Sequence, residues 1–262
     1  MKRKVAIPLI AAAIVLAPNL RGQGLAGDRQ PNRAELCSNA DTLTHAAQRG
    51  CADKVREFLA ANGIDSQNGS ESEALITAIR AGNKEIVEIL LRAGAPVNPS
   101  ETKLWPPLSD AAFTKHFDIM KLLLESGAKV DAPDHRGVTL LASTGFFDPT
   151  VTTILLDAGA DPKAADREGQ TALMKASARG LKQTVKILND HHVDLNQKDV
   201  MGRTALMHAA AGHLSDAIPI LLENGADVTA LDKEGQSALD LADKSNNLGA
   251  IAMLSLAVKR SH

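Results

Sequence analysis

The residues of this chain that could do chemistry are few and scattered. His191 and His192 are adjacent, but sequence neighbours rarely point to one metal ion, and no cysteine lies near them. The chain has no HExxH zinc motif, no glycine-rich phosphate loop and no GxSxG nucleophile motif. A Ser-His-Asp triad assembles only in space, so the sequence leaves that alternative open. We expect no enzyme, no cofactor and no metal site, and we interpret the histidine pair as a solvated turn.

The two cysteines, Cys37 and Cys51, lie close together near the N-terminal end. In an oxidising compartment such a pair persists as a disulfide, which at this loop length would contribute about 3 kcal/mol. The alternative is two unpaired thiols that flank a helix. A redox pair would need surroundings that lower a thiol pKa, and the sequence signals none. We therefore expect the disulfide.

The first residues have the pattern of an export signal. A basic start, MKRK, precedes an apolar run of 13 residues from Val5 to Ala17. A membrane-spanning helix needs about 20 apolar residues, so the run is short for that role. The pattern predicts a secretory signal peptide over residues 1–26, cleaved after Ala26, and a periplasmic or secreted product. An uncleaved anchor is the alternative.

The charge balance argues against a nucleic-acid partner. Removal of residues 1–26 takes away four cations and no acid, so the net charge moves from −2 to −6. Phosphate binding needs a basic surface, which this chain lacks. We expect a monomer that binds no nucleic acid and has no stable membrane insertion after cleavage.

An internal repeat organises the rest of the chain. Similar stretches begin at Asp134 (DHRGVTLLA), Asp166 (DREGQTALM), Asp199 (DVMGRTALM) and Asp232 (DKEGQSALD), at spacings of 32, 33 and 33 residues. Asp-x-x-Gly is turn chemistry, and the Thr or Ser that follows suits a helix N-cap. A second series, LLRAGA, LLESGA, LLDAGA and LLENGA, predicts amphipathic helices that end at glycine.

This pattern resembles the ankyrin repeat, a unit of about 33 residues with a turn and two helices. The first-helix signatures here are TALMKAS at Thr171, TALMHAA at Thr204 and SALDLAD at Ser237. The resemblance implies an all-α solenoid over residues 39–262, after a tail or short leading helix over 27–38. We expect seven stacked units that begin near residues 39, 69, 103, 136, 168, 201 and 234. The units must stack because none buries its apolar stripe alone.

Departures from the repeat predict local irregularity. The fourth unit is one residue short between its helices, and its second helix should begin at Asp148 and Pro149, as N-cap and first residue. His192 replaces the usual glycine in the fifth unit, which requires a left-handed conformation that His adopts only at some cost. Pro219 falls about one turn into the second helix of the sixth unit, where we expect it to bend the helix.

The resemblance also implies a binding surface, because ankyrin proteins usually bind through their turn tips and the ends of their first helices. Val138, which follows a turn glycine, is one of the positions that the family leaves variable. Carried onto this sequence, the candidate partner-binding residues are Trp105, Phe113, His135, Arg136, Phe146, Phe147, Arg167, Glu168, Arg179, Val200, Met201 and Arg203.

The aromatic residues separate into two groups. Phe58 lies in a second-helix stripe and is assigned to the core, and Phe117 begins a second helix as a core or half-buried residue. The others, at variable positions of units three and four, are Trp105, Phe113, Phe146 and Phe147. Because aromatics with Arg and Met anchor interfaces, we predict a hydrophobic patch edged by His135, Arg136, Arg167 and Met201. Gap filling in the shortened fourth unit is the alternative.

The sequence thus predicts a non-catalytic protein–protein interaction module that acts after export. Its partner would be a periplasmic enzyme that it protects, inhibits or stabilises. A secreted effector or toxin-neutralising protein is an alternative from another class. A hydrolase or redox enzyme built on the repeats is the third.

Overall fold

The computed structural model describes residues 33–62, 70–99, 105–146 and 148–261. The signal peptide expected over residues 1–26 and the side chain of Phe147 lie outside these ranges.

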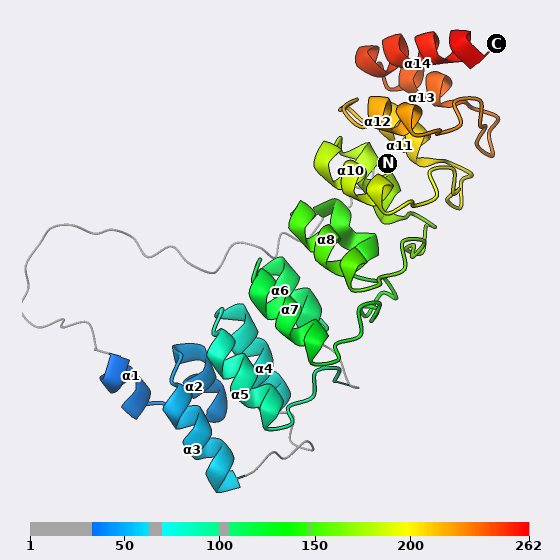
Figure 1. Cartoon of the computed structure of the whole chain (residues 1–262). Helices are drawn as coiled ribbons and strands as arrows, with labels where there is room; N and C mark the ends of the chain where they lie inside the picture. The colour runs from blue at the N-terminus through cyan, green and yellow to red at the C-terminus, as the bar shows by residue number, and fades with distance from the viewer. Residues whose placement is uncertain (1–32, 63–69, 100–104, 147, 262) are drawn as a thin grey trace, which may run out of the picture.

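Within the described ranges the chain folds into helices that follow one another in seven pairs (Figure 1). A short helix, α1 (Arg33–Ser38), precedes them. The pairs are α2 (Leu43–Arg49) with α3 (Ala52–Asn62), α4 (Ser70–Arg80) with α5 (Lys84–Arg92), α6 (Pro107–Phe113) with α7 (Phe117–Glu125), η1 (Leu141–Phe146) with α8 (Pro149–Asp157), α9 (Ala172–Ala178) with α10 (Lys182–Asp190), α11 (Ala205–Ala211) with α12 (Ile218–Glu223), and α13 (Ala238–Lys244) with α14 (Leu248–Ser261). The predicted all-α repeat solenoid is confirmed.

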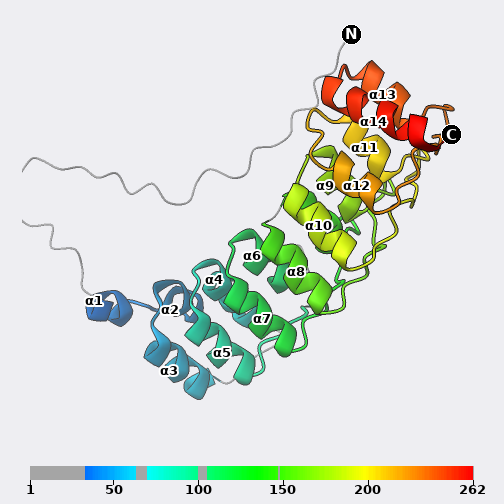
Figure 2. The same cartoon turned by 45° about the horizontal axis from the view of Figure 1, so that its top comes forward.

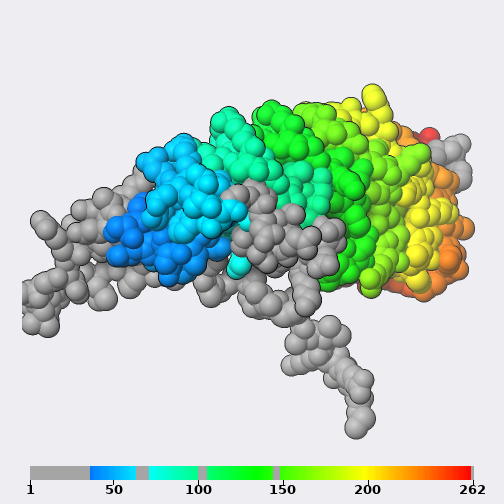
Figure 3. Space-filling model, turned by 90° about the horizontal axis from the view of Figure 1, so that it is seen from below, coloured from blue at the N-terminus to red at the C-terminus, as the bar shows by residue number. Residues whose placement is uncertain are grey.

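The pairs stack into two layers along one curved body (Figure 2). The second helix of each pair contacts the second helix of the next, in the order α3, α5, α7, α8, α10, α12 and α14. The first helices form the other layer, in which η1, α9, α11 and α13 contact one another in turn. In the space-filling view the units follow one another in chain order along an elongated molecule (Figure 3).

Local sequence chemistry explains where the first helices begin. The hydroxyl of Thr171 accepts a hydrogen bond from the backbone N–H of Met174, and the hydroxyl of Thr204 does the same for Met207. These bonds satisfy donors that the first helical turn leaves without a partner. The N-cap role predicted for these hydroxyl residues is confirmed.

Small and branched apolar residues fill the space between the layers. Ala209 and Ala210 are fully buried on α11, which lets neighbouring first helices approach closely. Leu155 and Leu188 are fully buried on the second helices α8 and α10. Phe58 and Phe117 are only half-buried, and both pack against this core. Short helices that would be marginal alone are therefore stabilised by their neighbours.

The irregular fourth unit begins its second helix as predicted. The Asp148 carboxylate accepts a hydrogen bond from the backbone N–H of Thr150 at 3.0 Å, and Pro149 occupies the first turn. Its first helix, η1, is a 3₁₀ helix rather than an α-helix. A 3₁₀ helix is more tightly wound, so this unit presents a narrower first helix to its neighbours.

Two further departures from the repeat have different outcomes. His192 has a φ of +54°, so it takes the left-handed conformation that the pattern required of it. The prediction that Pro219 bends a helix is wrong, because α12 begins only at Ile218 and Pro219 lies in its first turn. Proline is favourable there, because backbone N–H groups in the first turn have no acceptor within the helix and the N–H that proline lacks is not needed.

A disulfide joins Cys37 of α1 to Cys51, which directly precedes α3, with 5.5 Å between the Cα atoms. This is the pairing that the sequence led us to expect. Cys51 is buried, and the Arg49 guanidinium also donates a hydrogen bond to the Leu36 carbonyl at 2.9 Å. Both connections hold α1 against the first unit.

Candidate partner-binding groove

The turns that carry the candidate residues are organised by one aspartate each. In every turn, one carboxylate oxygen accepts hydrogen bonds from the backbone N–H groups two and four residues further on. Asp134 accepts from Arg136 and Val138, Asp166 from Glu168 and Gln170, Asp199 from Met201 and Arg203, and Asp232 from Glu234 and Gln236, all at 2.8–3.0 Å. The Asp-x-x-Gly turns therefore have the chemistry expected from the sequence.

The second carboxylate oxygen of each aspartate takes a different partner. Asp134 pairs with Arg136 of its own turn at 2.8 Å. Asp166 pairs with Lys175 of α9 at 2.7 Å. Asp199 pairs with His208 at 2.8 Å, and Asp232 with Arg203 of the preceding turn at 3.2 Å. These side chains fix the turns to the first helices and to one another.

Hydrogen bonding lowers the pKa of three turn carboxyls, those of Asp134, Asp166 and Asp232. Burial alone would raise the pKa of Asp166, but the bonds from the Lys175 ammonium and from backbone N–H groups outweigh it. The same balance, with the N–H of Val138 and the side chain of Arg136, lowers the pKa of Asp134. The N–H of Gln236 is the main cause of the lowered pKa of Asp232. All three values lie below the ordinary 3.8.

Acid should therefore unfold the solenoid through these turns. A carboxyl with a lowered folded pKa contributes stability above its ordinary value and loses that contribution as the pH falls through the folded value. We expect the urea midpoint to fall as the pH drops from about 4 toward 2. In the variant Asp166→Asn the midpoint should be lower at pH 7 but should decline less on acidification. An equal decline in both proteins would contradict the assignment.

The row of turns is interrupted between units four and five. The N–H of Val200 donates to the Glu168 carbonyl at 3.0 Å, and the N–H of Lys233 donates to the Met201 carbonyl at 2.9 Å. No backbone hydrogen bond joins residues 134–138 to residues 166–170, all of which the structure describes. We number each turn by its unit, so that turn four spans residues 134–138, turn five 166–170, turn six 199–203 and turn seven 232–236. Turns five to seven are therefore linked in a ladder that does not reach turn four.

The space beside the turn glycines shows the same interruption. A Cβ atom added to Gly169 would lie 3.0 Å from the backbone nitrogen of Val200. At Gly202 the equivalent atom would lie 3.1 Å from the nitrogen of Lys233. At Gly137 it would meet nothing within 4 Å. Turn five therefore does not pack on turn four as turns six and seven pack on their predecessors.

Matched alanine substitutions test this difference in packing. Gly137 and Gly169 have similar φ values, +80° and +75°, so both Gly137→Ala and Gly169→Ala incur about 1–2 kcal/mol of left-handed strain. Only Gly169→Ala also forces a Cβ against neighbouring backbone. We expect it to be the more destabilising of the two by about 1 kcal/mol or more, measured by urea unfolding. Equal losses would mean that turn four is packed like the others.

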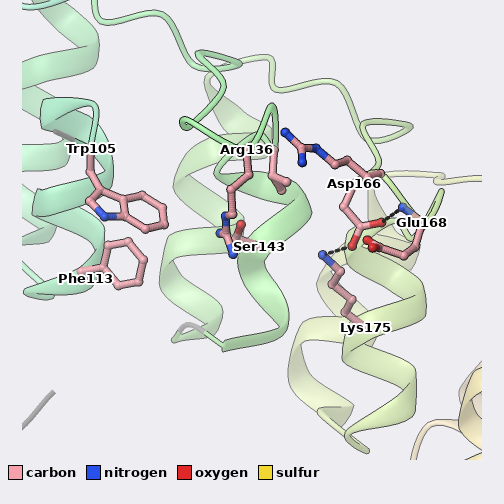
Figure 4. A pocket seen from close by; sticks show the side chains of 9 residues that line it. Trp105, Phe113, Arg136, Ser143, Asp166, Glu168 and Lys175 are labelled. Atoms are coloured by element: carbon pink, nitrogen blue, oxygen red, sulfur yellow. Dashed lines mark hydrogen bonds and ion pairs between the residues drawn. The ribbon is translucent and has the colours of Figure 1, made fainter. Parts of the chain in front are cut away.

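A groove of about 490 Å³ lies at the interruption (Figure 4). Trp105 and Phe113 line one side of it, Asp166 and Lys175 the other, and Arg136 and Ser143 lie between. Val138, Arg167 and Glu168 complete its lining.

The aromatic side of the groove is a connected cluster. The rings of Trp105 and Phe113 meet edge to face, with centroids 5.1 Å apart. The Trp105 ring also contacts the ring of His135 at 5.6 Å, and the Arg136 guanidinium lies over it at 5.4 Å. Trp105 is half-buried, whereas 49% of Phe113 is exposed. The cluster therefore bridges unit three to the turn of unit four and still presents apolar surface to solvent.

A small residue on η1 explains why the groove is open. Lys175 and His208 stand at the fifth position of the TALMKAS and TALMHAA signatures and reach back to Asp166 and Asp199. The equivalent residue of the fourth unit is Ser143, whose side chain is much shorter. Asp134 therefore pairs with Arg136 instead, and the space above η1 stays unfilled.

The structure brings together one part of the predicted set. Around the groove lie Trp105, Phe113, His135, Arg136, Arg167 and Glu168. Val200 and Met201 are exposed on the turn of unit six, while Arg203 is half-buried and paired with Asp232. Arg179 is exposed beyond the end of α9. The side chains of Phe146 and Phe147 lie outside the described residues, so the predicted patch is described only at Trp105 and Phe113.

Some groove residues were not predicted. These are Ser143, Asp166 and Lys175. Val138, which was expected at an exposed variable position, lines the groove as a largely buried residue. Comparison of the fifth signature position between units could have identified Ser143 and Lys175 in advance.

Other kinds of site are not seen in the part of the chain that the structure describes. None of its His, Cys, Asp and Glu side chains gather in threes or more as a metal ion would require. His191 and His192 are exposed where α10 ends. None of the described helices is both long and apolar enough to cross a membrane.

Comparison with known proteins gives one consistent match. The sequence profile of a family described as ankyrin repeats (3 copies) matches residues 43–134 and 140–232, which is more than half of the chain.

Three relatives illustrate the similarity. An ankyrin repeat-containing protein of Treponema pallidum is 32% identical over 121 residues, which cover 45% of this chain and 41% of that protein. Ankyrin repeat, SAM and basic leucine zipper domain-containing protein 1 of Ornithorhynchus anatinus is 30% identical over 126 residues, covering 46% and 27%. E3 ubiquitin-protein ligase KEG of Arabidopsis thaliana is 31% identical over 176 residues, covering 63% and 10%. The chain thus spans less than half the length of each of these relatives.

Proposed function

This chain belongs to the ankyrin-repeat family, and we propose that it binds another protein through the groove between Trp105 and Lys175 without catalysing a reaction. Ankyrin repeats generally serve as protein–protein interaction modules, so the family supports the general role. The particular surface is a proposal from the geometry of this molecule.

The observation that carries the proposal is the Trp105–Phe113 pair. The two rings contact each other at the rim of a groove, and half of Phe113 is exposed although it is apolar. Exposed aromatic surface next to Arg side chains is typical of the anchors that dominate binding energy. Arg136 and Arg167 lie on the same groove. The surface therefore combines an apolar anchor with cations that would orient a partner.

We also propose that the protein acts after export, in the periplasm or outside the cell, as a monomer. The basic and apolar start of the chain and the Cys37–Cys51 disulfide both support this location. The partner would then be an exported protein, such as an enzyme that this chain protects, inhibits or stabilises.

Affinity capture from the periplasmic or secreted fraction tests the proposal. The double variant Trp105→Ala, Phe113→Ala should lose a partner that the unchanged protein retains. Truncation of an anchor side chain commonly weakens binding by at least about 30-fold, which is enough for the partner to be lost from the captured material. Leu248→Ala is the matched control, because Leu248 is 72% exposed and lies on α14. If the double variant folds normally and keeps every partner, the groove is not the binding surface.

A further inference from the structure

The interruption between turns four and five leaves two backbone groups open at the groove. Both linked pairs of turns use the same two positions. The donor is the N–H of the residue that follows the Asp of the later turn, and the acceptor is the carbonyl two residues after the Asp of the earlier turn. The equivalent groups of turns four and five are the Arg167 N–H and the Arg136 carbonyl. Neither has a hydrogen-bond partner among the described residues, and Arg136 and Arg167 both line the groove.

The length of the fourth unit explains why this link is missing. The spacing from Asp134 to Asp166 is 32 residues, whereas the two later spacings are 33. The open space beside Gly137 shows that turn five does not close over turn four. The open donor and acceptor are therefore a consequence of the sequence, and both belong to residues that line the groove together with the aromatic cluster and the Asp166–Lys175 pair.

From this arrangement we infer that the groove takes an extended segment of the partner protein, which adds itself to the row of turns. Its backbone accepts a hydrogen bond from the Arg167 N–H and donates one to the Arg136 carbonyl. An apolar side chain of the segment lies against Trp105 and Phe113. This inference rests on the proposed function and specifies the conformation of the bound partner.

An extended segment fits these groups better than a helix does. Except at its two ends, a helix satisfies its backbone N–H and carbonyl groups internally, so it cannot offer a neighbouring donor and acceptor to an open ladder. An extended segment has both kinds of group unpaired, and adding it to an exposed backbone edge is an established mode of recognition. Main-chain bonds then supply affinity for many sequences, while the aromatic cluster selects the side chain between them.

Proline substitutions in the free protein test the open link. Arg167 and Val200 both follow the Asp of a turn closed by a hydrogen bond from Gly N–H to Asp carbonyl, at 2.9 Å in each case. Proline suits that second turn position, so Arg167→Pro and Val200→Pro each remove an N–H without opposing the turn. We expect Val200→Pro to lower the thermal midpoint and Arg167→Pro to leave it unchanged or raised. The Arg167 amide should also exchange with deuterium faster than the Val200 amide.

Peptide selection tests the bound state. Random 12-residue peptides displayed on phage are selected on the full chain and then titrated as synthetic peptides. Trp105 is the only tryptophan and the chain has no tyrosine, so intrinsic fluorescence reports directly on the groove. We expect peptides that shift this emission and protect the Arg167 amide from exchange. Arg167→Pro should weaken them about 2- to 10-fold, whereas Arg167→Ala, which keeps the N–H, should weaken them less.

The two proposals fail in different ways. The extended-segment inference is overturned if the Arg167 amide is as protected as the Val200 amide in the free chain. It is also overturned if no selected peptide shifts the Trp105 emission, or if Arg167→Pro binds such peptides as tightly as Arg167→Ala does. If Trp105→Ala, Phe113→Ala still abolishes capture of a natural partner in those cases, the proposed function stands and only the bound conformation is wrong.

Discussion

Replacing Lys175 with methionine is expected to lower the free energy of unfolding by about 2–4 kcal/mol, although the apolar length of the side chain is kept. The Lys175 ammonium lies 2.7 Å from the Asp166 carboxylate and donates to the Ala142 carbonyl at 2.9 Å. The two side chains are only 15% and 11% exposed. Removing the ammonium leaves a largely buried carboxylate without its partner, which is more damaging than losing a surface ion pair.

The position of Lys175 adds to this effect. The backbone ladder is absent between turns four and five, so Lys175 supplies a connection there by joining α9 to η1 through Ala142. Its loss should therefore loosen the coupling between the two halves of the solenoid as well as lower stability. In a solenoid each unit depends on contacts with its neighbours, so weaker coupling makes unfolding less cooperative.

Urea unfolding followed by circular dichroism measures both effects. Lys175→Met should lower the midpoint and also broaden the transition or reduce its slope. Lys186→Met on α10 is the control, because Lys186 is exposed and no partner for its ammonium is seen in the described structure. A loss below about 0.5 kcal/mol in Lys175→Met, as for an ordinary surface substitution, would mean that the pair contributes nothing to the stack.

Much of the fold could be predicted because its determinants are local. The turn aspartates, the Thr and Ser caps and the glycines that follow the second helices of most units act within a few residues of their own position. The periodicity of about 33 residues then requires these elements to stack. The same locality explains the start of α8, where Asp148 and Pro149 take the predicted roles without help from other units.

The groove could not be predicted because it depends on how neighbouring units meet. The missing residue of unit four was visible in the sequence, but its consequence was not. It appears as a 3₁₀ helix and an open turn link, and the short Ser143 side chain, which the sequence does show, leaves a groove only because of how these units meet. The prediction that Pro219 bends a helix was wrong for a related reason, because the effect of the proline depends on where α12 begins and not on the residue alone.

The two alternatives for the aromatic residues, exposed patch and gap filler, meet in one cluster. Trp105 fills space between units three and four through its contacts with His135 and Arg136. Phe113 packs on Trp105 and remains half-exposed. A ring that is held by its neighbours needs little further ordering when a partner arrives, so packing on one side favours binding on the other.

Removing the disulfide is the other change with a large expected effect. The Cys37–Cys51 bond closes a loop with a sequence separation of 14 and ties α1 to the first unit. By the chain-entropy relation, removing the bond lowers the free energy of unfolding by about 3 kcal/mol, because the unfolded chain regains the conformational entropy that the closed loop removes. Cys51 is buried in the same core cluster as Ala46 and Val55, so serine there would add an unfavourable polar group. Alanine at both positions is therefore the cleaner test.

The expected result is a loss confined to the N-terminal end. Cys37→Ala, Cys51→Ala should lower the stability of α2 and α3, read by amide exchange, while α11 and α13 keep theirs, because repeats contact only their neighbours. A reducing agent should reproduce the loss in the unchanged protein and have no effect on the double variant. Thiol labelling of the denatured protein gives the direct check, since two reactive thiols without prior reduction would show that the bond is not formed. Uniform destabilisation of all units would instead mean that the solenoid unfolds as one block, in which case the missing turn link would not divide it.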